Sequence, residues 1–516
     1  MIFRSPLPDV EIPDLLLTEV VLRHAAAQPE KAALVDGPSG RTLTYGELDT
    51  LVRRFAGGLA ARGIGPGSVI AVMAPNLPEY AVVFLGTAYA GAAITTINPT
   101  YTAPEVHHQL EDSGACLLVT VGAFLETART GAVETGVEAI FTIDPTDGAE
   151  PLSALLGDPL TTAVRVPTSA TVALPYSSGT TGLSKGVILS HANLVANIEQ
   201  VLAPLAIRAD ETIMGVLPFF HIYGMQVIMN TTLAAGATVV TMPRFDLEQF
   251  LQLHQDHRIT RSYVAPPIVV ALAKHPIVDS YRLDALESVF SGAAPLSAEL
   301  AEEAAARLGC EVVQGYGMTE MSPVSHLTPR GGYVPGSVGV TTPNTETCIV
   351  DPETGARLGT DADGEVWVRG PQVMVGYLNN AEATAATLDA DGWLHTGDIG
   401  HIDAAGHLHI VDRLKELIKY KGFQVAPAEL EALLLTHPDL ADAAVIGVPD
   451  PEAGEVPVAF VVVKPERSPS EDEVKAFVAE QVATYKQLHR ITFVDAVPKS
   501  ASGKILRRVL RDQASA

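Results

Sequence analysis

The sequence predicts an α/β fold: a large N-terminal domain of parallel-type sheets layered with helices, a small β subdomain, and a small mobile α+β domain at the C-terminus. Three observations support this. The 516 residues exceed what one hydrophobic core can hold. Short apolar strands alternate with amphipathic helices over the first three quarters of the chain. Beyond residue 411 a charged segment introduces a different order of elements.

The first helix-to-strand unit shows the pattern. Thr44 and Glu47 form a capping-box signature, and four apolar residues then recur on one helical face: Leu48, Leu51, Phe55 and Leu59. A strand at 69–73 follows a glycine-rich turn. Further strands are expected at 115–121, 237–242, 262–265 and 288–291. Helices that alternate with such strands predict parallel sheets covered on both faces.

The uncharged stretch 80–97 is nearly long enough to cross a membrane. Its glycines and threonines, and the strand-like residues at 93–97, instead favour a buried helix followed by a strand.

The C-terminal part predicts a separate domain. We expect an N-terminal domain at 1–411, a hinge in the charged segment 412–416, and a lid domain at 417–516. Pro427 can open a helix that ends before Pro438. Strands at 443–448, 456–463 and 491–497 and a helix at 471–481 complete a small α+β unit.

Composition limits the possible partners and location. Hydrophobic residues make up 47% of the chain and charged residues 18%, which is typical of a globular protein. The net charge of −26 argues against binding nucleic acid or anionic membranes. The three cysteines have no metal-ligand spacing, and the N-terminus has no signal-peptide pattern. We therefore expect a cytoplasmic protein with no membrane span and no obligate protein partner.

Residues 177–186 read SSGTTGLSKG and predict a phosphate-binding loop. The loop follows a strand-like run and precedes a segment interpreted as helical, and its glycines allow backbone N–H groups to face an anion. The residues that flank Lys185 break the Walker A pattern, which disfavours a phosphoryl-transfer NTPase. The four hydroxyls of Ser177, Ser178, Thr180 and Thr181 suit several phosphate oxygens, as in a leaving pyrophosphate.

Three further segments carry chemistry. Residues 314–320 read QGYGMTE and combine close-approach glycines, an aromatic ring and a hydroxyl–carboxylate pair suited to phosphate and magnesium. Residues 396–398 read TGD and present a carboxylate that can bind ribose hydroxyls. Residues 498–504 read PKSASGK and place a lysine after a Ser-Gly loop.

Taken in this order, with the hinge segment VDRLKELIKYKGFQV at 411–425, these motifs resemble the adenylate-forming superfamily of acyl-CoA synthetases, luciferases and peptide-synthetase adenylation domains. The segments at 219–224, 265–269 and 419–431 are most similar to 4-coumarate:CoA ligases and their bacterial relatives. Two departures are GEVWVRG at 364–370, where the family usually has GEICIRG, and Phe290, where plant members often carry lysine.

The resemblance implies ATP, Mg²⁺ and coenzyme A as ligands. It implies catalytic roles for Lys504, Lys419, Gln424 and His221. It implies ATP or AMP binding by Ser177, Ser178, Gly179, Thr180, Thr181, Lys185, Ala293, Ala294, Gln314, Gly315, Tyr316, Thr319, Asp398, Arg413, Lys415, Lys419, Gln424 and Lys504, with Glu320 serving the metal. It implies an acid pocket of His221, Tyr223, Ala293, Gly315, Gly317, Pro323 and Val324, and a CoA site of Arg244, Lys421 and Gly422.

The implied reaction is an ATP-dependent carboxylic acid:CoA ligation through an acyl-AMP, with a cinnamate-type acid. Lys504 is expected to catalyse adenylation, and Lys415 to be the pivot about which the lid domain turns. Alternatives within the superfamily are a medium-chain fatty acyl-CoA synthetase, a luciferase-like oxygenase and a carrier-protein-loading enzyme. A P-loop kinase and a non-catalytic nucleotide sensor are the alternatives from other classes.

Overall fold

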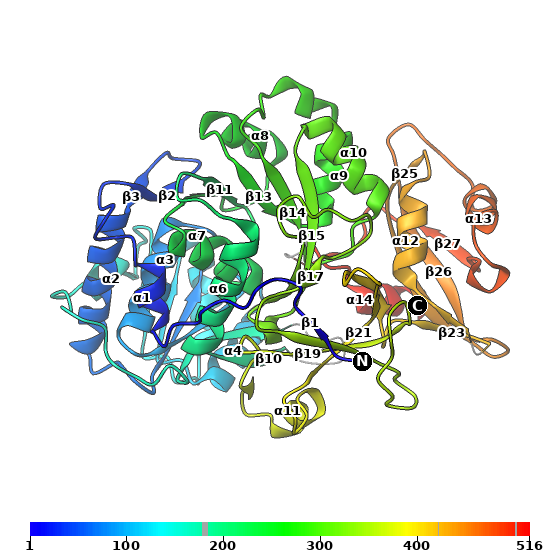
Figure 1. Cartoon of the computed structure of the whole chain (residues 1–516). Coiled ribbons are helices and arrows are strands. Elements are labelled where there is room, and N and C mark those ends of the chain that lie inside the picture. Colours follow the sequence, from blue (N-terminus) through cyan, green and yellow to red (C-terminus); the bar gives the residue numbers. More distant parts are fainter. Residues whose placement is uncertain (178–183, 422, 501–502, 516) are drawn as a thin grey trace.

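The computed structural model describes residues 1–177, 184–421, 423–500 and 503–515. Within these ranges, two large sheets dominate the N-terminal part (Figure 1). The first sheet has the strand order β20-β10-β9-β5-β4-β6-β7-β8. Its strands are β4 (Val69–Met73), β5 (Ala93–Thr96), β6 (Leu117–Thr120), β7 (Ala139–Thr142), β8 (Glu150–Pro151), β9 (Thr171–Ser177), β10 (Lys185–Ser190) and β20 (Gly376–Tyr377).

The second sheet has the order β17-β16-β15-β14-β13-β11-β12-β2-β3. Its strands are β2 (Ala32–Asp36), β3 (Thr42–Thr44), β11 (Thr212–Gly215), β12 (Thr238–Thr241), β13 (Arg261–Val264), β14 (Ser288–Ser291), β15 (Glu311–Gly317), β16 (Val324–Leu327) and β17 (Val340–Thr341). The central strands of both sheets are parallel, which confirms the predicted α/β class.

Helices cover both sheets and share one large core with them. They are α1 (Leu17–Val21), α2 (Tyr45–Ala60), α3 (Pro78–Tyr89), α4 (Ala103–Ser113), α5 (Leu125–Ala132), α6 (His191–Leu205), α7 (Thr231–Ala234), α8 (Leu247–Asp256), α9 (Pro266–Lys274), α10 (Ala298–Leu308) and α11 (Ala381–Thr387). Thr44 caps α2 and Glu47 completes the capping box, as the sequence predicts. The stretch 80–97 is a buried helix and strand, α3 and β5. Throughout the described ranges, every helix is too short or too polar to span a membrane.

A third sheet and the small domain follow. The third sheet contains β1 (Phe3–Arg4), β18 (Glu346–Val350), β19 (Gly364–Arg369), β21 (Leu394–Ile402) and β22 (Leu408–Arg413). The small domain, orange to red in Figure 1, contains β23 (Ile418–Tyr420), β24 (Phe423–Val425), α12 (Pro427–Leu435), β25 (Leu440–Asp450), β26 (Gly454–Val463), α13 (Glu471–Ala479), β27 (Arg490–Phe493) and α14 (Arg507–Ser515). The α+β order of this domain therefore agrees with the expected elements.

One local expectation is wrong: a strand, β10, follows the phosphate-type loop instead of a helix. Strand β10 pairs antiparallel with β9, so the loop joins two neighbouring strands. The reason is burial, because Val187 and Leu189 of β10 pack into the core beside the sheet. The helix α6 begins only after Ser190, whose side chain caps it.

Candidate active site

The candidate site lies beyond the carboxyl ends of β13, β14 and β15, where ligands bind in open α/β sheets. The segments that follow β14 and β15 contain the predicted glycine-rich motifs. The small domain also reaches this edge, because a Cβ added at Gly503 would lie 3.0 Å from the Cβ of Ala265, directly after β13. The two domains therefore meet at the end of the sheet.

An ion pair between a buried carboxylate and a half-buried arginine forms one side of the site. The Asp398 carboxylate accepts a hydrogen bond of 2.6 Å from the Tyr316 hydroxyl and lies 3.2 Å from Nε of Arg413. Asp398 and Arg413 are adjacent because β21 and β22 are paired at this register. Burial raises the pKa of the Asp398 carboxyl, and Arg413 and the Tyr316 hydrogen bond oppose that rise.

Lys504 is brought to this ion pair from the C-terminal end of the chain. Its pKa is lowered by burial and by the charge of Arg413, and the carboxylates of Glu320 and Asp398 oppose this effect. The same lysine, together with burial, lowers the pKa of His221 to about 3. These mutual electrostatic effects place the ammonium of Lys504 among groups from three distant parts of the sequence.

Glu320 is the carboxylate predicted to serve magnesium. It is buried, and its Oε1 accepts a hydrogen bond of 2.8 Å from the hydroxyl of Tyr377, which sequence reasoning missed. Tyr377 also lies under Lys185, with Nζ 4.4 Å from the ring centroid. No motif points to Tyr377, because a Gly-Tyr pair after a loop has no chemical signature by itself. Pairing of β20 with β10 brings it to the site.

The residues present fit a magnesium ion held mainly by nucleotide. Among the described residues no group of three or more His, Cys, Asp or Glu side chains could hold a metal. Mg²⁺ in such sites is usually bound by one or two carboxylates, with phosphates and waters supplying the other ligands. The buried carboxylate of Glu320 matches that arrangement.

The expected acid pocket is lined by aromatic side chains. Tyr223 opens a π-helix (Tyr223–Asn230) and donates a 3.1 Å hydrogen bond to the carbonyl of Phe290. A side chain at Gly315 would place its Cβ 2.6 Å from the Phe290 ring, so this ring takes up the space that the glycine leaves open. Phe290, the residue that departs from the plant pattern, therefore fills the space beside Gly315.

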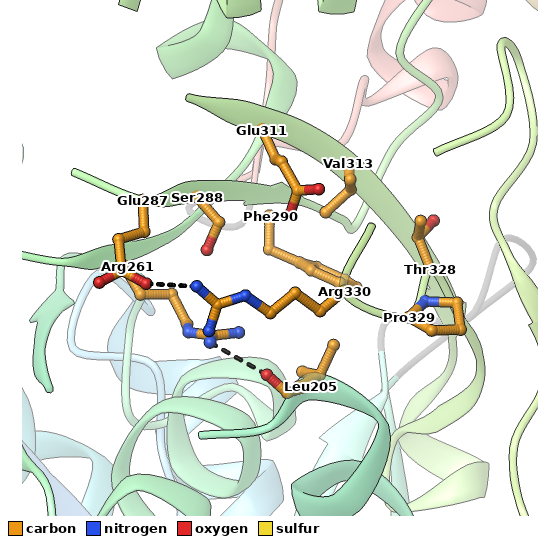
Figure 2. A pocket seen from close by; sticks show the side chains of 10 residues that line it. All are labelled: Leu205, Arg261, Glu287, Ser288, Phe290, Glu311, Val313, Thr328, Pro329 and Arg330. Carbon is orange, nitrogen blue, oxygen red and sulfur yellow. Dashed lines mark hydrogen bonds and ion pairs between the residues drawn. The ribbon is translucent and has the colours of Figure 1, made fainter. Parts of the chain in front are cut away.

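Charged side chains lie near Phe290 around a small cavity (Figure 2). This cavity has a volume of about 20 Å³ and is lined by Phe290, Val313, Arg261 and Arg330, among others. Arg330 pairs with Glu287 at 2.8 Å, and Arg261 donates to the carbonyl of Leu205 at 3.1 Å. Phe290 therefore borders both Gly315 and this polar cavity.

The other predicted site residues on the large domain lie along the same edge. Gln314 is buried and its side-chain oxygen accepts from the backbone of Leu296, which fixes the turn through Ala293 and Ala294. Thr319 precedes Glu320 and is also buried. At Gly317 a Cβ would lie 2.2 Å from the carbonyl oxygen of Pro323, so the close approach of Pro323 and Val324 requires glycine.

Several predicted residues are not brought to Lys504. Lys419 and Gln424 pair across the exposed β23–β24 hairpin, and Lys421 lies at its turn with a positive φ. Lys415 and Arg244 are exposed. Five predicted residues lie outside the described residues: Ser178, Gly179, Thr180, Thr181 and Gly422.

A carboxylate–arginine pair on β21 and β22 therefore faces the end of β15 through Tyr316, and the small domain supplies a lysine to the same place. The chain belongs to the AMP-binding enzyme family, which it matches over residues 21–378, and the C-terminal domain of that family matches residues 429–504.

Relatives and solved structures agree with this assignment. The chain is 45% identical to 4-coumarate--CoA ligase 5 of Oryza sativa subsp. japonica, over 100% of this chain and 98% of the relative. It is 45% identical to 4-coumarate--CoA ligase 1 of Petroselinum crispum, over 99% of this chain and 96% of the relative. An anthranilate CoA ligase in complex with anthranoyl-AMP superposes with a TM-score of 0.91 at 26% identity, over 98% of both chains. A benzoate CoA ligase from Burkholderia xenovorans LB400 gives 0.88 at 27% identity, over 96% of this chain and 100% of the other.

Proposed function

We propose that this chain is an ATP-dependent carboxylic acid:CoA ligase whose acid is 4-coumarate or a related cinnamate. The observation that carries the proposal is the meeting of Lys504 with Asp398, Arg413 and Glu320 at one edge of the sheet. A carboxylate does not acylate a thiol directly, because its leaving group would be oxide, and an acyl-AMP provides a stable phosphate leaving group. Attack of the acid on the α-phosphate of ATP releases pyrophosphate.

The proposed roles follow the geometry of the site. Asp398 and Arg413 hold the ribose, and Tyr316 orients Asp398 through its hydroxyl. Lys504 stabilises the charge that develops between the acid and the α-phosphate. Glu320 and Thr319 serve Mg²⁺ and the α-phosphate. The adenine contacts are assigned to Ala293, Ala294 and Tyr316, and the terminal phosphates to Ser177, Ser178, Gly179, Thr180, Thr181 and Lys185. Gln314 and Gly315 belong to the same proposed nucleotide site.

The acid pocket supports a short, flat substrate. Tyr223 and Phe290 supply aromatic walls, and the Phe290 ring closes the pocket at Gly315. Burial and Lys504 lower the pKa of His221 to about 3, so His221 is neutral at physiological pH and adds no positive charge to the pocket. The carboxylate of the acid is then attracted mainly to Lys504. Gly317, Pro323 and Val324 complete the proposed pocket.

We further propose that the second half-reaction uses another orientation of the small domain. The exposed hairpin with Lys419, Lys421 and Gln424 lies apart from the Lys504 loop, so one orientation serves adenylation and another would bring the hairpin to acyl-AMP and CoA. The proposed boundaries are 1–411 for the N-terminal domain, 412–416 for the hinge and 417–516 for the small domain, with Lys415 as the pivot. Gly422 is assigned to the CoA site, and Arg244 to a contact with a CoA phosphate. A cytoplasmic location without an obligate partner fits the use of ATP and CoA.

A panel of acids tests the proposal. The protein is incubated with ATP, Mg²⁺ and one acid from the cinnamate, benzoate or C6–C12 fatty acid series, with and without CoA. With CoA, the expected result is pyrophosphate and AMP in a 1:1 ratio, dependent on the acid, with the highest kcat/KM for a cinnamate. Without CoA, pyrophosphate is expected together with acyl-AMP in place of free AMP. Release of ADP, or no acid-dependent pyrophosphate, would overturn the ligase assignment. A preference for fatty acids would keep the ligase and replace the proposed substrate.

A further inference from the structure

Tyr377 occupies a place in the site that no motif assigns. It ends β20, the two-residue strand that pairs antiparallel with β10, and it lies opposite Val187. Leu378 donates its backbone N–H to the carbonyl of Gly186 at 2.8 Å, and Thr384 accepts the N–H of Tyr377 at 2.9 Å. The backbone of Tyr377 is thus tied to the strand that begins at Lys185 and to helix α11.

The side chain of Tyr377 joins two parts of the nucleotide site. Its hydroxyl donates a 2.8 Å hydrogen bond to Oε1 of Glu320. The Nζ of Lys185 lies over the Tyr377 ring, 4.4 Å from the ring centroid. Tyr377 is 8% exposed and Glu320 5%, so little water competes for their hydrogen bond. One side chain therefore touches both the proposed metal carboxylate and the proposed pyrophosphate lysine.

Each contact has a physical consequence. A hydroxyl that donates to a buried carboxylate forms a charge-assisted hydrogen bond, which fixes the direction of the carboxylate oxygens. An ammonium over an aromatic face is attracted to the ring and stays near it when no anion is bound.

We propose that Tyr377 is a positioning residue that presets Glu320 for Mg²⁺ and Lys185 for the terminal phosphates of ATP. The hydroxyl acts on the metal side and the ring on the phosphate side. This inference rests on the proposed roles of Glu320 and Lys185. It predicts that the two functions separate when the hydroxyl and the ring are removed in turn.

Two substitutions at Tyr377 test the hydroxyl and the ring separately. Tyr377→Phe removes the hydrogen bond to Glu320 and keeps the ring, whereas Tyr377→Leu removes both. Tyr45→Phe is the matched control, because Tyr45 is buried and donates to the carbonyl of Ala237 at 2.7 Å, in contact with neither Glu320 nor Lys185. Equilibrium binding of ATP is measured by calorimetry on the full chain in EDTA and across a MgCl₂ titration.

The two variants should differ in which measurement changes. For Tyr377→Phe we expect about a tenfold rise in the Mg²⁺ concentration that half-maximally tightens ATP binding, with metal-free binding unchanged. For Tyr377→Leu we expect the same rise and, in addition, roughly threefold weaker ATP binding in EDTA. Tyr45→Phe should behave as wild type in both measurements. In a Glu320→Gln background, Tyr377→Phe should add no further change in Mg²⁺ dependence.

Three results would overturn the inference. They are wild-type Mg²⁺ dependence in Tyr377→Phe, equal weakening of ATP binding with and without metal in that variant, and identical metal-free binding in Tyr377→Leu and Tyr377→Phe. These binding readouts do not depend on the acid or on CoA. A failure of the ligase assignment would appear instead as wild-type protein that releases no acid-dependent pyrophosphate.

Discussion

At the scale of single residues, burial and neighbouring charges set the pKa of Lys504. Burial and the charge of Arg413 lower its pKa, and the carboxylates of Glu320 and Asp398 oppose that shift. A cationic donor that is already in place when the reaction starts stabilises developing negative charge without reorganising.

We predict that Lys504→Ala blocks the first half-reaction selectively. Loss of one preorganised donor typically costs about 3–4 kcal/mol, or roughly 10²–10³ in rate. The ATP–pyrophosphate exchange rate should fall by that factor, while thioester formation from preformed acyl-AMP stays close to wild type. Lys499→Ala is the matched control, because Lys499 lies in the same loop and pairs with Asp442 at 2.6 Å. Equal losses in both half-reactions would contradict this role.

A second prediction at the residue scale concerns the packing of the Phe290 ring against Gly315. A methyl group at Gly315 would overlap the Phe290 ring, which is held against the Tyr263 ring at a centroid distance of 5.7 Å. We expect Gly315→Ala to raise the KM of the acid about tenfold, since overpacking costs about 1–3 kcal/mol. Adding Phe290→Leu should recover part of the loss. Gly359→Ala is the control, because nothing lies within 4 Å of that position. An unchanged acid KM in Gly315→Ala would show that the ring does not limit the pocket.

At the scale of elements, helix α12 has an N-cap that comes from outside its own segment. Ala426 is the N-cap residue and has no side chain that could accept a hydrogen bond. Asp412 fills this role, accepting the backbone N–H of Ala428 at 2.8 Å. Asp412 precedes the expected pivot Lys415 and α12 follows it, so this hydrogen bond crosses the hinge.

We therefore predict that Asp412→Ala weakens the domain orientation seen here. Losing an N-cap costs about 1 kcal/mol, which corresponds to roughly a fivefold drop in the rate of adenylation. Thioester formation from acyl-AMP should not fall. Ser470→Ala removes the cap of α13 inside the small domain and should leave the ratio of the two half-reactions unchanged. A parallel fall of both rates in Asp412→Ala would rule out an effect on orientation.

At the scale of the whole molecule, buried histidines couple stability to pH. Burial lowers the pKa of His191 and His254 to about 4 and that of His326 to about 3. The unfolded chain binds these protons near pH 6.5, and the folded chain does not bind them until the lower values are reached. The free energy of unfolding is therefore unaffected by these histidines above pH 6.5. It decreases as the pH falls from 6.5 toward 4, because protons bind to the unfolded chain only.

We expect the free energy of unfolding to fall by up to about 1.4 kcal/mol per pH unit for each such histidine between pH 6.5 and 4. Urea midpoints at pH 7.5, 6.5 and 5.5 measure this slope. His326→Gln should flatten it, whereas replacement of the exposed His489 by glutamine should not. A slope that is the same in wild type and His326→Gln would refute the contribution of His326.

Much of the fold could be predicted from sequence because its signals are local. The capping box at Thr44, the strands at 69–73 and 288–291 and the helix from Pro427 follow from hydrophobic period and capping residues, and all are present. The segment after the phosphate-type loop is a strand, β10, whereas the sequence predicts a helix there. Its true state depends on pairing with β9 and β20, and a single-segment pattern does not contain that information.

The sequence by itself determined the fold class, the order of motifs and the identity of the charged groups. Glycine, hydroxyl and lysine patterns express backbone and side-chain chemistry that does not depend on distant contacts. Only the tertiary structure decided which of these groups meet. It brought Lys504 to Asp398, set Phe290 against Gly315 and placed Tyr377 between Glu320 and Lys185. These contacts join segments tens to hundreds of residues apart, and strand pairing and domain packing set their register.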